Sequence, residues 1–245
     1  MANKHNITST EVEKFASLSD QWWDANGPFK PLHIINPTRI SYLKEHICRH
    51  YTRDLTTNKP LNNLDIIDIG CGGGLVSEPL CRLGGNVTGV DASEKNIGTA
   101  KFHASQMGLN INYTNSPLAE LITNNTQYDV VLALEVIEHV DNLEEFINDI
   151  YSLCKPQGLI ILSTINRTIK SYLSAIIGAE YILRWLPIGT HSWDKFLKPS
   201  EIVNQFKSYN AQLLDISGLS FNPLNSGWKI TNNFDINYFI SIKKK

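Results

Sequence analysis

The sequence predicts an α/β fold: a doubly wound, mostly parallel sheet with helices on both faces. Two observations predict this fold. Short β-branched runs alternate with longer amphipathic segments, and a glycine-rich turn follows the first run. Crossovers between parallel strands are almost always right-handed, so a chain that alternates in this way winds helices onto both faces. The predicted strands are, in order, residues 64–69, 86–90, 111–114, 128–134 and 159–163.

Prolines set two of the predicted helix starts. Asn36 and Pro37 supply a cap and a first-turn proline, so we expect a helix to begin there with Arg39 in its first turn. Pro79 lies where the first crossover helix should run. That helix must therefore begin near Ser77 or be kinked in its opening turn.

The last third of the chain departs from this alternation. Residues 165–198 form an insertion much longer than the roughly 2–6 residues usual for a connection in such folds, which indicates a lid or a docking element. A helix is then expected over residues 200–208. Two further runs, 212–219 and 235–242, are expected to pair antiparallel at one edge of the sheet.

Composition excludes several classes of protein. The 245 residues are 42% hydrophobic, which suffices for a full core. Lys and Arg total 22 against 24 Asp and Glu, so no global field attracts nucleic acid or anionic lipid. The four cysteines lie far apart, which suits a reducing compartment, and neither a secretory signal nor a membrane span is predicted. We expect a cytoplasmic protein that binds no nucleic acid.

The segment Asp68-Ile-Gly-Cys-Gly-Gly-Gly74 carries the first functional signal. Gly70 and Gly72 let the backbone turn tightly and approach a ligand at the carboxyl end of the first strand. Asp91 follows at the roughly 20-residue spacing from which an acid binds ribose hydroxyls. Leu75 stands where the dinucleotide fingerprint has its third glycine, which favours S-adenosylmethionine, a cofactor without a pyrophosphate. The alternatives are an NAD-type dehydrogenase and an ordinary tight turn.

Arg39 and Leu134 are further candidates for the cofactor site. A cation at a helix start is unfavourable by the helix dipole unless an anion lies near it. We therefore expect Arg39 to hold the aminoacyl carboxylate of the cofactor, because Arg binds carboxylates bidentately; the alternative is a solvated cation. Leu134 ends the fourth predicted strand, where it would pack on the adenine or serve as an ordinary core leucine.

Glu135, Glu138 and His139 directly follow the fourth predicted strand. Their spacing would place both carboxylates and the imidazole on one side of a helical turn, facing the crevice of the sheet. Such a set indicates a divalent-metal site or a general base for an acceptor. The alternative is that Glu138 and His139 only cap and orient the loop. Without a metal, His139 or His191 would act as the base.

Narrower motifs lie on either side of these segments. They are Trp22-Trp23-Asp24, Phe29-Lys-Pro-Leu-His33 and Gly178-Ala-Glu-Tyr-Ile-Leu-Arg184, and Ile35-Asn-Pro37 with Arg39 lies between them. With them, the chain resembles the ubiquinone biosynthesis O-methyltransferase family from about Glu11 to Lys243. The glycine and Glu-His segments recur across class I methyltransferases, so the narrower motifs carry the resemblance to this family.

The resemblance implies a seven-stranded, Rossmann-like class I methyltransferase sheet. It implies S-adenosylmethionine at Arg39, Gly70, Asp91 and Leu134, to which the glycine turn adds Gly72. We expect a single domain over the whole chain. Its parts would be an N-terminal helical cap (1–60), a cofactor-binding core (61–164), the insertion (165–198), and a C-terminal helix with antiparallel edge strands (199–245).

The resemblance also implies a reaction and a metal. The family methylates phenol and catechol hydroxyls of polyprenylated ubiquinone precursors, 2-polyprenyl-6-hydroxyphenol and 3-demethylubiquinol, and the resemblance implies magnesium at Glu135, Glu138 and His139. Two alternatives stay open. The chain could methylate another small-molecule hydroxyl, or act as a non-catalytic, cofactor-binding scaffold of the quinone pathway.

The insertion suggests where a polyprenyl substrate would be met. Residues 170–186 mix Tyr, Leu, Ile and Trp with Lys170 and Arg184, a combination typical of interfacial helices. Our hypothesis is that this segment covers the acceptor and contacts the inner face of the cytoplasmic membrane as a peripheral element. A quinone-biosynthesis complex would be a further partner. The alternative is an ordinary amphipathic helix packed on the sheet.

Overall fold

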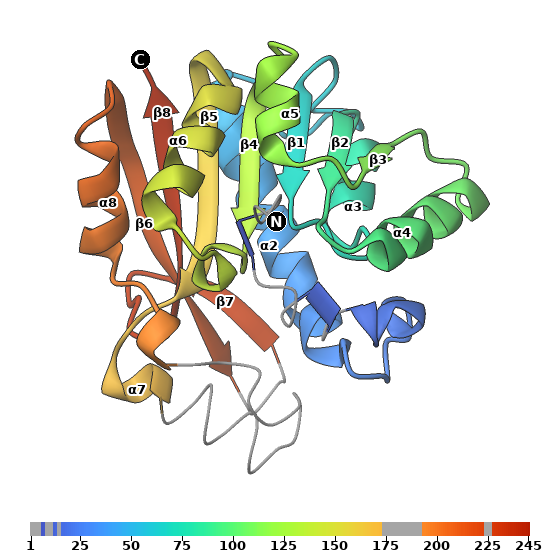
Figure 1. The fold of residues 1–245 in the computed structure, drawn as a ribbon, viewed down its shortest axis with the longest axis horizontal. Coiled ribbons are helices and arrows are strands. Elements are labelled where there is room, and N and C mark those ends of the chain that lie inside the picture. Colours follow the sequence, from blue (N-terminus) through green and yellow to red (C-terminus); the bar gives the residue numbers. More distant parts are fainter. Residues whose placement is uncertain (1–5, 8–11, 14–15, 173–192, 223–226) are drawn as a thin grey trace.

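The computed structural model describes residues 6–7, 12–13, 16–172, 193–222 and 227–245. These residues form one sheet with the strand order β3-β2-β1-β4-β5-β8-β6-β7 (Figure 1). The strands are β1 (Asp65–Ile69), β2 (Asn86–Val90), β3 (Asn112–Thr114), β4 (Tyr128–Leu134), β5 (Cys154–Ile165), β6 (Ala211–Asn222), β7 (Gly227–Thr231) and β8 (Asn237–Lys244).

Strands β1 to β5 are parallel to one another, and β6, β7 and β8 complete the sheet with antiparallel pairs. The predicted doubly wound α/β fold is thus confirmed, as is the antiparallel pairing of the two C-terminal runs, now β6 and β8. The described residues contain one strand more than the seven that the resemblance implies. The additional strand, β7, pairs with β6 and forms the edge, whereas β8 lies between β5 and β6.

Helices fill the connections as the alternation predicts. They are η1 (Ser19–Gln21), α2 (Lys30–His50), α3 (Ser77–Arg82), α4 (Glu94–Gln106), α5 (Leu118–Thr123), η2 (Ile137–His139), α6 (Leu143–Leu153), α7 (Ile169–Ser171), η4 (Trp193–Lys195) and α8 (Pro199–Phe206). None of the helices within the described ranges is long and apolar enough to cross a membrane. Most of the insertion, residues 173–192, lies outside the described part of the chain.

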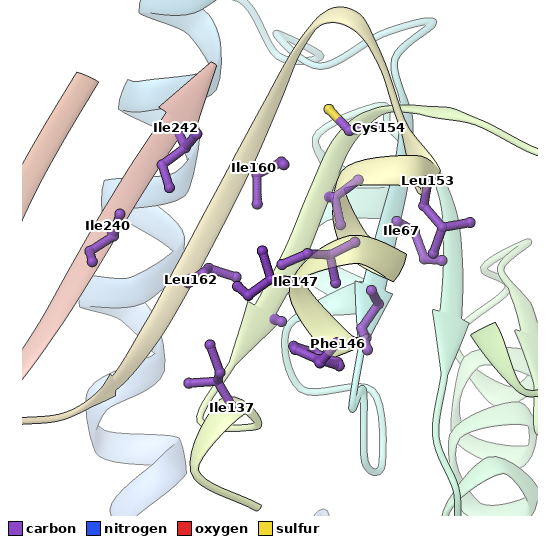
Figure 2. Packing of buried hydrophobic residues seen from close by; sticks show 14 of the residues in the cluster. Ile67, Ile137, Phe146, Ile147, Leu153, Cys154, Ile160, Leu162, Ile240 and Ile242 are labelled. Atoms are coloured by element: carbon purple, nitrogen blue, oxygen red, sulfur yellow. The ribbon is translucent and has the colours of Figure 1, made fainter. Parts of the chain in front are cut away.

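Two hydrophobic layers sandwich the sheet. Side chains alternate along a strand, so Val131 and Ala133 of β4 face the layer formed with α6 and α8, while Val130, Leu132 and Leu134 face the layer formed with α2. Figure 2 shows α6 lying over the strands in the first layer, with its apolar side chains directed at them. Both faces are buried, which explains why the parallel strands read as continuous apolar runs.

Helix α2 corrects the predicted helix start. The helix begins at Lys30 with Pro31 next to its first residue, and Pro37 lies inside it. Arg39 is therefore well inside the helix and buried, so its expected place in the first turn, and the dipole reasoning based on it, are wrong. A proline near residue 31 satisfies the same preference for an N-terminal proline. Pro37 cannot donate a helical hydrogen bond, yet the helix continues through it and buries Ile35, Leu43 and Ile47.

Candidate functional site

The loops that follow β1 and β4 meet at the point where the strand order reverses direction. In open α/β sheets, ligands bind at this switch point, at the carboxyl ends of the strands. Gly70 ends the β1 side with φ of +72°, and a Cβ on it would lie 2.2 Å from Cγ2 of Val136. Only a glycine permits this contact, so the residue brings the two loops together.

Gly72 and Asp91 join the glycine turn to the end of β2. The Gly72 N–H donates to Asp91 Oδ2 at 2.9 Å, and the Ser93 N–H donates to Asp91 Oδ1 at 2.8 Å. Asn96 Nδ2 donates to the same Oδ1 at 3.1 Å. Gly72 has a φ of +54°, and a Cβ there would lie 2.4 Å from the Trp22 ring. The predicted cofactor residues Gly70, Gly72 and Asp91 are thus brought together.

Arg39, on α2, is paired with Glu135, which directly follows β4. Its Nη2 is 3.3 Å from Glu135 Oε1, and the Ser163 hydroxyl donates to the same oxygen at 2.9 Å. Arg39 Nε is buried and has no hydrogen-bond partner within the described residues. A buried donor of this kind fits a carboxylate ligand, because leaving it unsatisfied costs free energy. Glu135 itself has a φ of +56°.

Glu138 and His139 lie on the short helix η2. Glu138 is buried, and its Oε2 accepts a hydrogen bond from the Thr164 hydroxyl at 2.8 Å. Burial, followed by the nearby charge of Glu135, raises the pKa of Glu138 to about 7, while the charge of His139 acts in the opposite direction. A carboxyl with this pKa changes protonation near neutral pH.

The magnesium site implied by the resemblance is not supported by this arrangement. Within the described part of the chain, no group of three His, Cys, Asp or Glu side chains could hold a metal ion. Glu135 leaves the turn with positive φ and contacts Arg39, whereas Glu138 contacts Thr164 on β5. Glu135 precedes η2 with positive φ, so the expected helical turn that contains all three residues is not formed. Their shared role at one ligand stays a prediction.

Comparison with known proteins decides the family. A family model described as a methyltransferase domain matches residues 40–216. The ubiquinone biosynthesis O-methyltransferase of Pelagibacter ubique is 48% identical over 98% of this chain and 99% of its own length. That of Bartonella tribocorum is 46% identical over 97% of this chain and 96% of its own length. The chain belongs to the ubiquinone biosynthesis O-methyltransferase family.

Solved structures agree on the fold of this family member. Magnesium protoporphyrin IX methyltransferase from Synechocystis, with bound SAH, has a TM-score of 0.67 at 20% identity, covering 97% of this chain and 95% of its own. A SAM-dependent methyltransferase from Aquifex aeolicus has a TM-score of 0.59 at 10% identity, covering 96% and 98%. The predicted class I methyltransferase fold is confirmed.

The Trp22-Trp23 motif packs on the glycine turn, a position that the sequence alone does not predict. Trp22 stacks on Phe29 with ring centroids 3.8 Å apart, and its Nε1 donates to Asn96 Oδ1 at 3.0 Å. Trp23 Nε1 donates to the Gly73 carbonyl at 3.0 Å. Both tryptophans therefore pack on the glycine turn. The only signal in the sequence is the adjacent Trp pair itself, which gives no partner. The other narrow motif, Gly178 to Arg184, lies outside the described residues.

Two buried residues beside the turn complete the site. Asp68, at the end of β1, accepts a hydrogen bond from the Ser77 hydroxyl at 2.6 Å, and burial raises its pKa to about 6. Helix α3 begins at Ser77, one of the two starts that Pro79 allows. Leu134 is buried in the layer that faces α2, as a core leucine would be. Its contact with an adenine stays a prediction.

Proposed function

We propose that this chain transfers the methyl group of S-adenosylmethionine to phenol and catechol hydroxyls of polyprenylated ubiquinone precursors. The acceptors would be 2-polyprenyl-6-hydroxyphenol and 3-demethylubiquinol. The curated relatives named for ubiquinone biosynthesis support the substrate class. The observation that carries the enzyme assignment is the 2.9 Å hydrogen bond from Gly72 to Asp91, because it unites the glycine turn and the ribose-binding acid at the switch point.

The residues around the crevice match the parts of the cofactor. The Asp91 carboxylate would accept the ribose hydroxyls, and the backbone at Gly70 and Gly72 leaves room for the aminoacyl arm. The buried Arg39 Nε, which lacks a partner within the described residues, would donate to the aminoacyl carboxylate. Leu134 would border the adenine. When bound, the cofactor supplies a methyl group that a positively charged sulfur activates for attack.

The acceptor hydroxyl must be activated by losing its proton, whereas the methyl group of the cofactor is already activated. A phenol has a pKa near ~10, so about one molecule in a thousand is ionised at neutral pH. His139 would accept the hydroxyl proton, leaving a phenolate oxygen that forms the new O–CH3 bond as the S–CH3 bond breaks. The negative charge of Glu138 would stabilise the imidazolium, since the two groups interact electrostatically. His191, the other base predicted from sequence, lies outside the described residues.

A magnesium requirement stays a prediction of the family resemblance, and no step above uses the ion. The donors offered by Glu135 and Glu138 are engaged with Arg39 and with hydroxyls of β5. Chelation tests the requirement directly. Methyl transfer that stops in chelator and returns with magnesium would require these side chains to leave their present partners.

Membrane contact is likewise our proposal, for the segment 170–186. Of its described residues, Lys170 and Tyr172 are exposed, and the preceding Ile169 is 76% exposed. An exposed aliphatic and an aromatic residue beside a lysine suit the boundary of an anionic bilayer. We expect flotation with phosphatidylglycerol vesicles and loss of flotation when residues 173–186 are deleted from a folded protein. Unchanged flotation would refute the assignment.

A quinone-biosynthesis complex is a further proposed partner, which co-purification would test.

The decisive experiment measures methyl transfer from labelled S-adenosylmethionine to short-chain demethylubiquinol. The wild-type protein should label the quinol, and Asp91→Ala should label it roughly 10- to 100-fold more slowly at a cofactor concentration below KM. A matched Tyr51→Phe variant, which loses one hydroxyl at the opposite end of the sheet, should retain activity. Labelling of other hydroxyl compounds but not of the quinol would favour a different acceptor. Normal pathway flux in Asp91→Ala would favour the scaffold alternative.

A further inference from the structure

Asn96 lies between the N-terminal cap and the proposed ribose-binding carboxylate. Its Oδ1 accepts a hydrogen bond from the Trp22 indole at 3.0 Å, and its Nδ2 donates to Asp91 Oδ1 at 3.1 Å. Both Asn96 and Trp22 are buried. One side chain on α4 therefore joins the cap, which precedes the sheet in sequence, to the acid that follows β2.

The indole decides which way the Asn96 amide faces. An indole N–H can only donate, so the amide must turn its oxygen toward Trp22. The amide nitrogen then faces Asp91, where it can only donate. The backbone N–H of Asn96 is fixed as well, because it donates to the Ser93 hydroxyl at 3.2 Å. Trp22 thus sets the orientation of a donor that Asp91 receives.

Trp22 also controls the second oxygen of Asp91. Its ring lies against Gly72, since a Cβ there would come within 2.4 Å of the ring, and Phe29 stacks on the ring with centroids 3.8 Å apart. The Gly72 N–H donates to Asp91 Oδ2, while Asn96 donates to Oδ1. Each oxygen of the carboxylate therefore receives a donor whose position depends on Trp22.

We propose that Trp22 and Asn96 are positioning residues that orient the Asp91 carboxylate, so that the N-terminal cap sets the affinity for S-adenosylmethionine. This inference rests on the proposed role of Asp91 in holding the ribose. Both residues act through Asp91 and belong to elements other than the segment from Glu135 to His139. Their loss should weaken cofactor binding and leave the rate at saturating cofactor unchanged.

The test compares cofactor affinity and turnover in four variants of the full chain. Asn96→Ala and Trp22→Phe should each raise the Kd for S-adenosylhomocysteine, measured by calorimetry, about three- to ten-fold, the range expected for one lost hydrogen bond. KM for S-adenosylmethionine should rise in parallel, with kcat and the KM for the quinol within twofold. Trp22→Phe should weaken binding less in the Asn96→Ala background than in the wild type, because the contact between Trp22 and Asn96 is then already lost and only the contact with Gly72 remains. Tyr51→Phe serves as the control and should change none of these values.

Asn96→Asp separates positioning from packing. It keeps the shape of the side chain and an oxygen for the indole, but replaces the donor that faces Asp91 with a second carboxylate. We expect at least a tenfold loss of affinity with an unchanged circular dichroism spectrum. Unchanged Kd in Asn96→Asp, or equal falls of kcat in all variants, would overturn the inference. If Asp91→Ala binds normally, the proposed role of Asp91 fails as well; if only Asp91→Ala weakens binding, this inference alone fails.

Discussion

The proposed site has two halves, a cofactor half around Gly70, Gly72 and Asp91 and an acceptor half around Glu135, Glu138 and His139. The two halves hold their acidic residues in different ways. On the cofactor half, Asp91 receives two backbone N–H groups, from Gly72 and Ser93, and one side-chain amide donor, from Asn96. On the acceptor half, Glu135 and Glu138 receive side-chain hydroxyls from adjacent residues of β5. Backbone donors are fixed by the fold, whereas hydroxyls can rotate and can either donate or accept.

This difference matches the two tasks proposed for the halves. The ribose of the cofactor takes no part in methyl transfer, so it is best held by donors that do not move. A base such as His139 changes charge when it takes the proton of the acceptor, so the groups beside it must tolerate both charge states. Burial raises the pKa of the neighbouring Glu138 to about 7, and the rotatable Thr164 hydroxyl can follow its protonation.

Of the changes considered, removing the His139 imidazole should have the largest effect on methyl transfer. In His139→Ala we expect kcat to fall about 100-fold or more, the usual contribution of a general base, with the affinity for S-adenosylhomocysteine unchanged. The loss should shrink as the pH rises toward 10, where the phenol ionises by itself. Initial rates between pH 6 and pH 10 provide the measurement. A deficit that is the same at every pH would exclude His139 as the base.

Removing the carboxylate of the cofactor half should give the opposite pattern. Asp91→Ala deletes a charged acceptor of the ribose hydroxyls, which corresponds to roughly a 10- to 100-fold loss of affinity. Calorimetry with S-adenosylhomocysteine and the KM for S-adenosylmethionine should both report it. At saturating cofactor, kcat should stay within a few fold. A fall in kcat alone would mean that the two halves are not separate in function.

The cofactor half is also the one that sequence predicts well. Its chemistry is local: a strand, a glycine turn and an acid at the end of the next strand follow one another at set spacings, and Gly70, Gly72 and Asp91 lie where those spacings place them. The parallel strands are predictable for the same reason, since each is a short apolar run between turns. Strand β7 is not, because Gly227–Thr231 is short, half-exposed and paired only with β6.

The acceptor half depends on contacts between distant residues, which spacing does not reveal. The spacing suggests one helical turn that contains Glu135 and Glu138, but Glu135 precedes η2 with positive φ and contacts Arg39. The hydroxyl partners lie on another strand and give no signal in the sequence near the acids. The packing of the Trp pair on the glycine turn is equally non-local, although the motif itself supports the family resemblance.

A methyl group at Gly72 should disturb the cofactor half without removing any charge. Gly72→Ala forces a residue with a Cβ into a φ of +54° and against the Trp22 ring. Together, the strain and the clash should cost about 1–2 kcal/mol and raise the KM for S-adenosylmethionine about tenfold. The control is Gly98→Ala on α4, where a Cβ meets nothing within 4 Å. Equal KM values in the two variants would contradict the close fit of Trp22 on the turn.

The smallest effect concerns stability, and it compares one buried acid from each half. The pKa of Glu138 is raised from 4.5 to about 7, so its folded state binds the proton more tightly than the unfolded state does. The stability from the protonated form is complete below pH 4.5 and is lost as the pH rises to 7. Glu138→Gln keeps a neutral side chain, so it should unfold at a higher temperature than wild type at pH 8 and at nearly the same temperature at pH 4.5.

Asp68→Asn supplies the comparison, because the pKa of Asp68 is raised from 3.8 only to about 6. Relative to wild type, Asp68→Asn should gain stability as the pH rises from 3.8 to about 6. The gain should reach its full size about one pH unit below that of Glu138→Gln. About 1–3 kcal/mol in either variant corresponds to a rise of roughly 2–12 °C in Tm at pH 8. Calorimetric melts in steps of half a pH unit would resolve the two windows. If both variants gained stability over the same pH range, the pKa of Glu138 would not lie nearer to neutral pH than that of Asp68.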